Sequence, residues 1–381
     1  MTRIRVPLGK FIKEYSERNK GNEDIPVYSV TNSQGFCTEY FGKEVASQDK
    51  TTYKIVPQGY FAYNPSRINV GSVDWQRYEK RVIVSPLYNV FSVSEGIDRQ
   101  YLYYFLRSDL GRQMIKAKAS GSVRDNLKLD MLKEMTIPDI SVEQQKFCSS
   151  VLDKLHKLIQ MRQQELQKLD EFIKARFVEM FGSPVSNPMS WEKRTLKEVC
   201  IKLNDGSHFS PESFETGDYK YVTAKNIKFS GFDFSNITYV PEAVHRPIFD
   251  RCNPEFEDVL YIKDGATTGV AIVNTLDEEF TLLSSVALLK QDRSIMNGYF
   301  LATLLNNKDM YLNIRNNMGG AAITRLTIAK LNAIEIIVPP IELQNQFAAF
   351  VAEVDKSKVA VQKALDETQT LFDSLMQEYF G

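Results

Sequence analysis

The sequence has few residues of the kinds that hold metals, form disulfide frameworks or cross membranes. Its 381 residues include four cysteines and three histidines, and no two cysteines form a CxxC pair. This scarcity argues against a disulfide framework and a zinc site, and it fits a reducing cytosol. No run approaches the roughly 18 consecutive apolar residues of a membrane helix, and the first residues lack the apolar region of an export signal. We therefore predict a cytoplasmic protein of two or three domains, without a metal site and without contact to a membrane.

The chain also lacks a strong net charge. Its formal net charge is −1 at pH 7, but the balance changes along the sequence. Residues 1–140 carry 21 Lys and Arg against 16 Asp and Glu, whereas residues 183–340 carry 16 against 19. A basic first segment is compatible with a polyanionic partner, but an excess this small does not establish one.

Motifs that carry out catalysis are missing as well. The sequence contains no P-loop, no GxGxxG after a strand, no GxSxG, no HExxH and no Asn-Pro-Pro-aromatic tetrapeptide of an amino-methyltransferase. Gly265–Gly269 lacks the lysine that would hold a phosphate. The clustered carboxylates Glu255, Glu257 and Asp258 are the best candidates for an active site, although a solvated turn is the simpler interpretation. We predict no catalytic residue, no metal and no cofactor in this chain.

What the sequence does contain is an internal repeat at a spacing of about 199 to 202 residues. A period this long is typical of a duplicated module of domain and helix, because solenoid repeats are far shorter. The front halves match weakly, at Val27–Thr31 and Tyr219–Thr223. The stronger matches are Leu127–Leu132 with Leu326–Leu331, Ile137-Pro138 with Val338-Pro339, Val142–Phe147 with Glu342–Phe347, and Phe181-Gly182 with Phe380-Gly381.

Two long helices are the clearest structural prediction. Apolar residues recur at alternating intervals of three and four in residues 141–182 and again 199 positions later, in residues 341–381. This is the spacing of a coiled-coil seam. Ser141 and Gln144 form a capping box, and Gly182 ends the first helix. We predict that the helices, each about 60 Å long, run antiparallel and bury each other's seam; two helices packed on their own domains are the alternative. The predicted seam residues are Leu152, Leu155, Ile159, Leu166, Leu169, Ile173, Val354, Val361, Leu365, Phe372 and Leu375.

The remaining segments mix short strands with helices, which predicts an α/β fold in each half. The expected order is a first globular domain in residues 1–140, a central helix in 141–182, a second globular domain in 183–340 and a distal helix in 341–381. The two domains would stand in a pseudo-twofold arrangement, separated by the antiparallel coiled coil. Strands are expected at Ile25–Val30, Tyr60–Tyr63, Arg81–Val84, Val259–Ile262, Val270–Val273 and Leu282–Leu289, and helices at Arg99–Lys118 and Ile295–Asn307.

Polar, glycine-containing loops occupy corresponding parts of the two halves. They are Tyr63–Ser72 and Ser120–Asn126 in the first half, and Asn204–Pro211, Lys263–Gly269 and Met318–Arg325 in the second. Arginine and asparagine make bidentate contacts to guanine and adenine edges, and serine binds phosphates or bases. Each loop alone is explained by a structural turn, but their recurrence in both modules favours binding.

With these features, the whole chain resembles the specificity (S) subunit of type I restriction–modification systems. The most specific elements are the two Leu-x-x-x-x-Leu…(Ile/Val)-Pro…Gln-x-x-Phe connectors, which lead into long helices that end in Phe-Gly. Asn64–Ser72 is similar to the NPxRxNxGS stretch of target recognition domains in that family. Asp205–Pro211, Val222–Ile227 and Asp264–Gly269 are similar to the DGTH-x-TP, TAKNI and DGATxG stretches of another subtype. Two subtypes in one chain imply two different half-site sequences.

The resemblance implies a non-catalytic subunit with two target recognition domains, which read an asymmetric, bipartite double-stranded DNA target through the major groove. The helices would fix the unread spacer and bind two methyltransferase (M) subunits, and restriction (R) subunits would add DNA cleavage. S-adenosylmethionine, ATP and magnesium are expected only in those partners. The second half departs from the first in having Ala321-Ala322 where the first has Ser122-Val123. The predicted DNA-binding residues are Asn64, Arg67, Asn69, Ser72, Ser122, Arg124, Asn126, Ser207, His208, Lys225, Asn226, Thr267, Thr268 and Arg325.

Two other classes of function stay open at this point. A coiled-coil scaffold with protein-binding ends would retain no DNA in a sequence-selective way. An enzyme with an unfamiliar site would show metal-dependent nuclease activity as the isolated chain.

Overall fold

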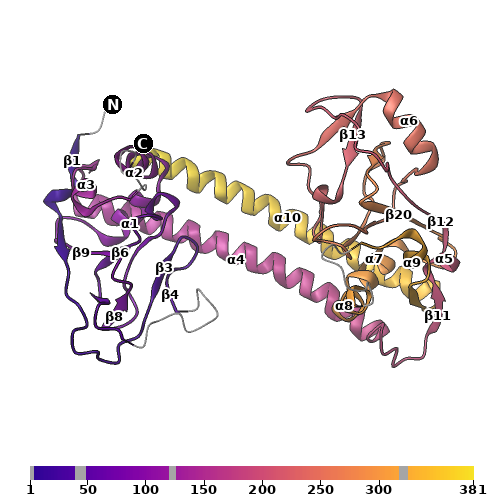
Figure 1. The fold of residues 1–381 in the computed structure, drawn as a ribbon, viewed down its shortest axis with the longest axis horizontal. Helices are drawn as coiled ribbons and strands as arrows, with labels where there is room; N and C mark the ends of the chain where they lie inside the picture. The colour runs from indigo at the N-terminus through magenta and orange to yellow at the C-terminus, as the bar shows by residue number, and fades with distance from the viewer. Residues whose placement is uncertain (1–3, 39–48, 120–125, 317–324) are drawn as a thin grey trace. The chain divides into compact units, whose positions relative to one another are not determined.

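The computed structural model describes residues 4–38, 49–119, 126–316 and 325–381, which form two compact units. Unit 1 consists of residues 1–163 and 363–381, and unit 2 of residues 164–362. The two predicted long helices are present as α4 (Val142–Phe181) and α10 (Ile341–Phe380), and each is shared between the units (Figure 1). The predicted boundaries near residues 140, 182 and 340 therefore coincide with helix ends, whereas the units divide inside the helices. None of the described helices is long and apolar enough to cross a membrane.

Unit 1 is built around a four-stranded antiparallel sheet in the order β2-β9-β6-β7, with two further two-stranded pairs, β5-β8 and β3-β4. A short pair, β1-β10, leads into α4. Besides α4 and α10, its elements are β1 (Arg5–Pro7), β2 (Ile12–Tyr15), β3 (Ser29–Thr31), β4 (Gly35–Cys37), β5 (Lys54–Pro57), β6 (Phe61–Tyr63), β7 (Val73–Trp75), β8 (Arg81–Val84), β9 (Asn89–Val93), α1 (Arg99–Arg107), α2 (Asp109–Ala119), α3 (Leu129–Lys133) and β10 (Thr136–Pro138).

Unit 2 repeats this plan with the four-stranded antiparallel sheet β12-β20-β17-β18 and adds the sheets β16-β13-β19 and β14-β15. The pair β11-β21 leads into α10. Its elements are β11 (Glu192–Thr195), α5 (Leu196–Val199), β12 (Cys200–Asp205), β13 (Tyr219–Val222), β14 (Ile227–Lys228), β15 (Gly231–Phe232), β16 (Thr238–Val240), α6 (Glu242–Arg251), β17 (Val259–Ile262), β18 (Ala271–Val273), β19 (Thr281–Leu282), β20 (Val286–Gln291), α7 (Gly298–Asn306), α8 (Lys308–Asn316), α9 (Ile328–Asn332) and β21 (Glu335–Val338).

The internal repeat is a structural duplication with a constant spacing from α1 onward. The helices α1, α2, α3 and α4 begin 199 residues before α7, α8, α9 and α10 respectively. Two of the sequence matches are therefore wrong in their spacing. The match of Ile137-Pro138 with Val338-Pro339 implied 201 residues and that of Val142–Phe147 with Glu342–Phe347 implied 200, whereas the structure repeats at 199. Phe147 is 65% exposed whereas Phe347 is fully buried, and the residue that takes the place of Phe347 in unit 1 is the buried Cys148.

A buried glutamine in the first turn of each long helix connects that helix to its unit. In unit 1 the Gln145 Oε1 accepts from the Asp98 N–H at 2.8 Å, and its amide donates to the Ile140 carbonyl at 3.0 Å. In unit 2 Gln344 accepts from the Asn297 N–H at 2.9 Å and donates to the Pro339 carbonyl at 2.7 Å. In each unit, one bond satisfies the backbone N–H of the residue that precedes α1 or α7. The other satisfies a backbone carbonyl just before the long helix itself, and neither group is then left without a partner. The start of α4 is thus attached to unit 1 in the same way as the start of α10 is attached to unit 2.

The Phe-Gly ends of both long helices have a packing role. Phe181 lies in the core of unit 2, with its ring centroid 4.7 Å from that of Phe300 in α7. Phe380 lies in the core of unit 1, 4.9 Å from the ring of Tyr101 in α1. Gly182 follows with a φ of +74°, a left-handed conformation that glycine adopts at the end of a helix without steric cost.

The two long helices pack against each other within each unit, as the antiparallel coiled-coil prediction requires. All eleven predicted seam residues are buried or half-buried. Polar seam positions have partners across the interface: Arg162 donates to the Thr368 hydroxyl in unit 1, and Lys358 lies 2.8 Å from Asp170 in unit 2. The Ser141–Gln144 capping box also forms, with bonds of 3.0 and 3.2 Å.

The predicted strands at Arg81–Val84 and Val259–Ile262 are confirmed, but two predicted elements are interrupted. The helix expected over Arg99–Lys118 breaks at Ser108, whose hydroxyl donates to the Phe105 carbonyl and accepts from the Gly111 N–H, so that it ends α1 and starts α2. The strand expected over Leu282–Leu289 breaks at residues 283–285. That break becomes part of the candidate site.

Candidate nucleic-acid interface

The first candidate loop, Asn64–Ser72, joins β6 to β7 and is held by its own backbone and side chains. The Asn64 Oδ1 accepts from the Ser66 N–H at 3.1 Å and from the Ser66 hydroxyl at 2.9 Å. Gly71, with a φ of +96°, ends the single 3-10 turn that follows. The backbone of the loop is therefore a defined structure.

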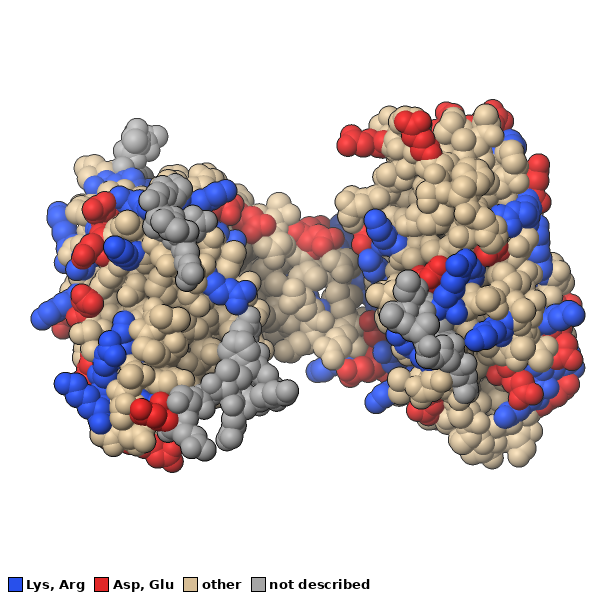
Figure 2. Space-filling model, in the orientation of Figure 1, with Lys and Arg blue, Asp and Glu red and all other residues tan. Residues whose placement is uncertain are grey.

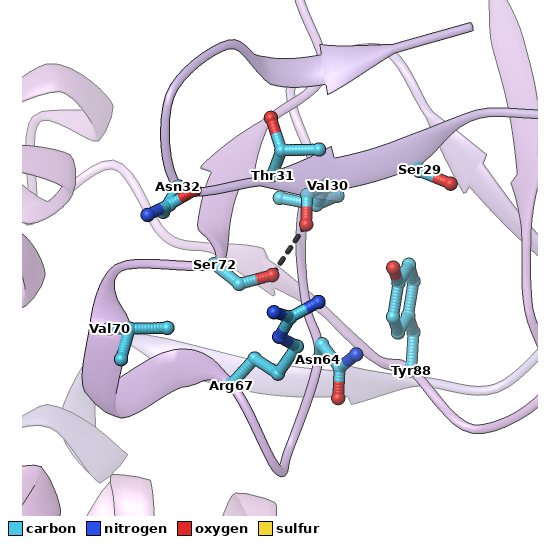
Figure 3. Close-up of a pocket in the computed structure, with 9 residues that line it drawn as sticks. All are labelled: Ser29, Val30, Thr31, Asn32, Asn64, Arg67, Val70, Ser72 and Tyr88. Carbon is cyan, nitrogen blue, oxygen red and sulfur yellow. Dashed lines mark hydrogen bonds between the residues drawn. The ribbon is translucent and has the colours of Figure 1, made fainter. Parts of the chain in front are cut away.

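Arg67 extends from this loop into a small polar pocket of about 90 Å³ (Figure 3). Its exposed side chain lies beside Asn64, and Tyr88 forms the opposite wall. The pocket is completed by β3 and the residue after it, Asn32, and by Val70 and Ser72 of the loop itself. A guanidinium in a polar pocket open to solvent provides paired donors that suit a guanine edge or a phosphate.

Arg107, which sequence reasoning did not single out, ties this loop to the neighbouring segment. From α1 its guanidinium donates to the Gly71 carbonyl at 2.6 Å and to the Asn32 carbonyl at 2.5 Å. It also stacks over Tyr103, 5.2 Å from the ring centroid. Arg107 thus holds two walls of the Arg67 pocket together, a role that only the tertiary contacts reveal.

In unit 2 the corresponding site is organised by a buried carboxylate. Asp205, at the end of β12, is 2% exposed and lies 3.1 Å from the ammonium of Lys263, which is equally buried. The His208 Nε2 lies 3.1 Å and the Arg251 guanidinium 3.6 Å from the same carboxylate. The stretches that begin at Asp205 and at Lys263, far apart in sequence, are therefore joined by a buried ion pair.

The break between β19 and β20, at Leu283–Ser285, joins the stretches Asp205–Pro211 and Val222–Ile227 to the loop that begins at Lys263. The Ser284 N–H donates to the Ser207 carbonyl at 2.8 Å, and the Ser285 hydroxyl accepts from the Ala224 N–H at 3.2 Å. The Lys263 N–H donates to the Ser285 carbonyl at 2.9 Å. Sequence reasoning missed this junction because the expected strand ran through it.

Four of the predicted DNA-binding side chains are buried and serve the loops themselves, so their burial does not support direct contact with DNA. The Ser72 hydroxyl donates to the Val30 carbonyl, and the Ser207 hydroxyl to the Phe209 carbonyl. Asn226 accepts from the Thr223 N–H, and the Thr268 hydroxyl donates to the Gly265 carbonyl. Short polar side chains that bond nearby backbone are the usual devices of such turns.

The other predicted residues divide by exposure. Arg325 extends towards Asp264, with 3.5 Å between the guanidinium and the carboxylate. Ser122 and Arg124 lie outside the described residues. The exposed set comprises Arg67, His208, Lys225, Thr267 and Arg325, and the half-buried set comprises Asn64, Asn69 and Asn126.

The carboxylates considered as an alternative active site form a structural cluster. Asp258 is 1% exposed, accepts from the Glu255 N–H at 2.8 Å and lies 3.3 Å from the Lys290 ammonium. Burial raises the pKa of Asp258, although Lys290 and the backbone bond oppose that shift. The expectation of a solvated turn is therefore wrong for Asp258, which is buried. Among the described residues, no group of three or more His, Cys, Asp or Glu side chains could hold a metal ion.

Charge does not gather into one continuous basic field on the face shown in Figure 2. Lysine and arginine side chains alternate with carboxylates and neutral residues on both units. This face therefore offers no single basic field for a polyanion.

A mixed α/β module that occurs twice, each copy followed by a long helix, defines a class of proteins built from a duplicated module. The family model of the type I restriction modification DNA specificity domain matches residues 9–171 and again 188–368. The chain belongs to this family, whose members provide DNA sequence specificity in type I restriction–modification.

Curated relatives and solved structures agree with this assignment. The MjaIX specificity subunit of a type I restriction enzyme from Methanocaldococcus jannaschii is 23% identical over 301 residues, which is 74% of this chain and 68% of that protein. The MjaVIII specificity subunit from the same organism is 21% identical over 394 residues, covering 96% and 91%.

Two solved structures share the fold. The S subunit of a type I restriction–modification system from M. genitalium is 15% identical with a TM-score of 0.60, covering 100% of this chain and 96% of that one. A chain from a structure that describes complex assembly and conformational transition of the type I system is 18% identical with a TM-score of 0.55, covering 99% and 97%. The predicted fold of two α/β modules with two long, mutually packed helices is confirmed.

Proposed function

We propose that this chain selects the DNA target of a type I restriction–modification complex by reading a bipartite, asymmetric sequence. Unit 1 reads one half through the Arg67 loop, and unit 2 reads the other through the loops joined at Asp205 and Lys263. The α4–α10 pair sets the length of the unread gap. The chain itself performs no catalysis.

The duplication supports this proposal more than any other observation. The helices of the two units repeat at a constant 199 residues from α1 and α7 onward, and their four-stranded sheets have the same strand order, whereas the loops in equivalent positions differ in sequence and in chemistry. A conserved frame with two different binding loops suits recognition of two unrelated half-sites. A protein-binding scaffold would not need the guanidinium and amide groups that match base edges.

We further propose that the chain acts in the cytoplasm with two M subunits and, in the complete complex, with R subunits. The partners would supply S-adenosylmethionine, ATP and magnesium, because methyl transfer to adenine and DNA cleavage would occur in their active sites. The chain would direct those activities to the selected site.

Co-expression with the cognate M subunit, followed by methylation mapping of the host genome, tests the proposal. The expected result is adenine methylation in a motif of two specified halves separated by a gap of fixed length. The isolated chain should bind DNA weakly. A continuous or palindromic motif, or no sequence-selective retention of DNA by the complex, would contradict the proposal, and metal-dependent nuclease activity of the isolated chain would favour an enzyme.

A further inference from the structure

Unit 2 has an electrostatic problem as a reader of DNA, since residues 183–340 carry 16 Lys and Arg against 19 Asp and Glu. Affinity for DNA ordinarily depends on cations that neutralise phosphates. Its most buried cation, Lys263, is already paired with Asp205 and so is not available to a phosphate. A contact that does not depend on positive charge would add to what the exposed cations of unit 2, such as Lys225 and Arg325, contribute.

Phe209 is an exposed apolar residue among the polar loops of unit 2. It follows His208 directly in the loop that leaves β12, and its side chain is 62% exposed. No aromatic ring of a described residue lies against it, in contrast to Phe229, which packs 6.1 Å from Tyr311. A phenylalanine left in water forgoes a burial gain on the order of 1.5–3 kcal/mol.

The backbone that carries Phe209 is held by hydrogen bonds to its own loop and to β19. The Ser207 hydroxyl donates to the Phe209 carbonyl at 2.6 Å and accepts from the Phe209 N–H at 3.3 Å. The Ser207 N–H donates to the Leu282 carbonyl at 2.7 Å. At Gly206 a Cβ atom would lie 1.9 Å from the same carbonyl, so only glycine permits this approach. The backbone from which the exposed ring extends is thus held in place beside the polar loops.

We propose that Phe209 is a specificity-determining residue of unit 2, whose ring contacts the C5-methyl group of a thymine in the half-site that this unit reads. The inference rests on the proposed function. Thymine is the base that presents an apolar group in the major groove, and phenylalanine is one of the side chains that contacts it. His208, exposed and oriented by Asp205, provides a polar contact next to it.

Replacing thymine by deoxyuridine tests this contact, because the replacement removes the methyl group alone. The M-containing complex is titrated with duplexes in which each thymine of the half-site is replaced in turn. For one position the wild-type complex should bind about fourfold more weakly, as expected for one buried methyl group. The Phe209→Ala complex should bind both duplexes equally, and Phe209→Leu should keep part of the discrimination.

Phe256→Ala is the matched control. Phe256 is also exposed, at 42%, but it lies in a cavity lined by Glu255, Asp277, Glu278 and Glu279, which disfavour DNA phosphates. This variant should keep the wild-type response to deoxyuridine. A wild-type complex that is insensitive to every replacement, a half-site without thymine, or an unchanged response in Phe209→Ala would overturn the inference. The absence of any gapped motif would instead overturn the proposed function.

Discussion

Unit 1 and unit 2 share a scaffold but differ in how their loops are stabilised and in what those loops expose. In unit 1, Arg67 extends from the β6–β7 loop into a solvent-open polar pocket, and Arg107 bridges the pocket walls. In unit 2, the equivalent loop begins with Lys263, whose ammonium is buried against Asp205. The guanidinium of Arg67 is thus exposed in unit 1, whereas the ammonium of Lys263 in unit 2 is buried in an ion pair with Asp205.

This difference separates the residues that maintain the fold from those that vary with specificity. The glutamine at the start of each long helix and the phenylalanine at its end have the same contacts in both units. The loops between the central strands do not. A duplicated frame can therefore carry two unrelated recognition surfaces, and changes in one loop set should leave the other half-site unaffected.

The largest expected effect comes from changing the helices that both units share. A heptad inserted into α4 alone, after Gln163, should abolish binding or lengthen the gap, because the seam of α10 would no longer match. Matched insertions in α4 and α10 should lengthen the gap by about 10 Å, or about three base pairs. Methylation mapping measures the gap directly. A gap of unchanged length would refute the role of the helices in setting it.

Lys263→Met should destabilise unit 2 by about 3–5 kcal/mol, because it leaves the Asp205 carboxylate buried without its closest ammonium. Denaturant unfolding of the full chain measures the loss. Arg67→Met is the matched control in unit 1, and because Arg67 is exposed it should change the stability by less than about 0.5 kcal/mol. Equal effects of the two substitutions would show that the loops do not differ in the way described.

Arg67→Ala should weaken binding at one half-site by on the order of 1–3 kcal/mol if the guanidinium is bidentate to a guanine. The test compares the affinities of the complex for targets with single-base changes in each half. Discrimination should fall at one position of the unit 1 half-site and stay intact in the other half. An equal loss on all sequences would make Arg67 a phosphate contact.

The smallest expected effect is a pH dependence that belongs to unit 2. His245 is fully buried between Tyr219 and Phe249, and burial lowers its pKa from the ordinary 6.5, although the bond to Glu279 opposes the shift. The unfolded chain then takes up a proton below about pH 6.5 that the folded chain does not, so stability falls as the pH decreases through that value. Thermal unfolding midpoints from pH 7.5 to 5.5 should fall less in His245→Gln than in the wild type. Identical slopes would exclude His245 as the cause.

The large-scale architecture could be predicted because its signals are long and local. In each long helix, apolar residues recur at alternating intervals of three and four over about forty residues, which predicts the helix. The same pattern occurs again 199 residues later, which predicts the duplication. Finer alignment failed because neighbouring polar residues look alike: Gln144 and Gln145 are adjacent, yet Gln145 is the one that is buried in the same role as Gln344.

The candidate site was only partly predictable, for two physical reasons. Serine, threonine and asparagine in glycine-containing loops bond backbone groups as readily as a ligand, so Ser72, which donates to Val30 in β3, and Asn226, which donates to Asp233, could not be told from exposed contacts. Residues that organise the site from a distance, such as Arg107 and Ser285, carry no local signal. Their roles follow from contacts between segments separated by tens of residues.

The most direct test of the account compares methylation maps from cells that express the M subunit with the wild-type chain, Arg67→Ala or Phe209→Ala. We expect one gapped motif in the wild type, with Arg67→Ala relaxing one half and Phe209→Ala relaxing the other. Maps in which both substitutions alter the same half would contradict the assignment of one half-site to each unit.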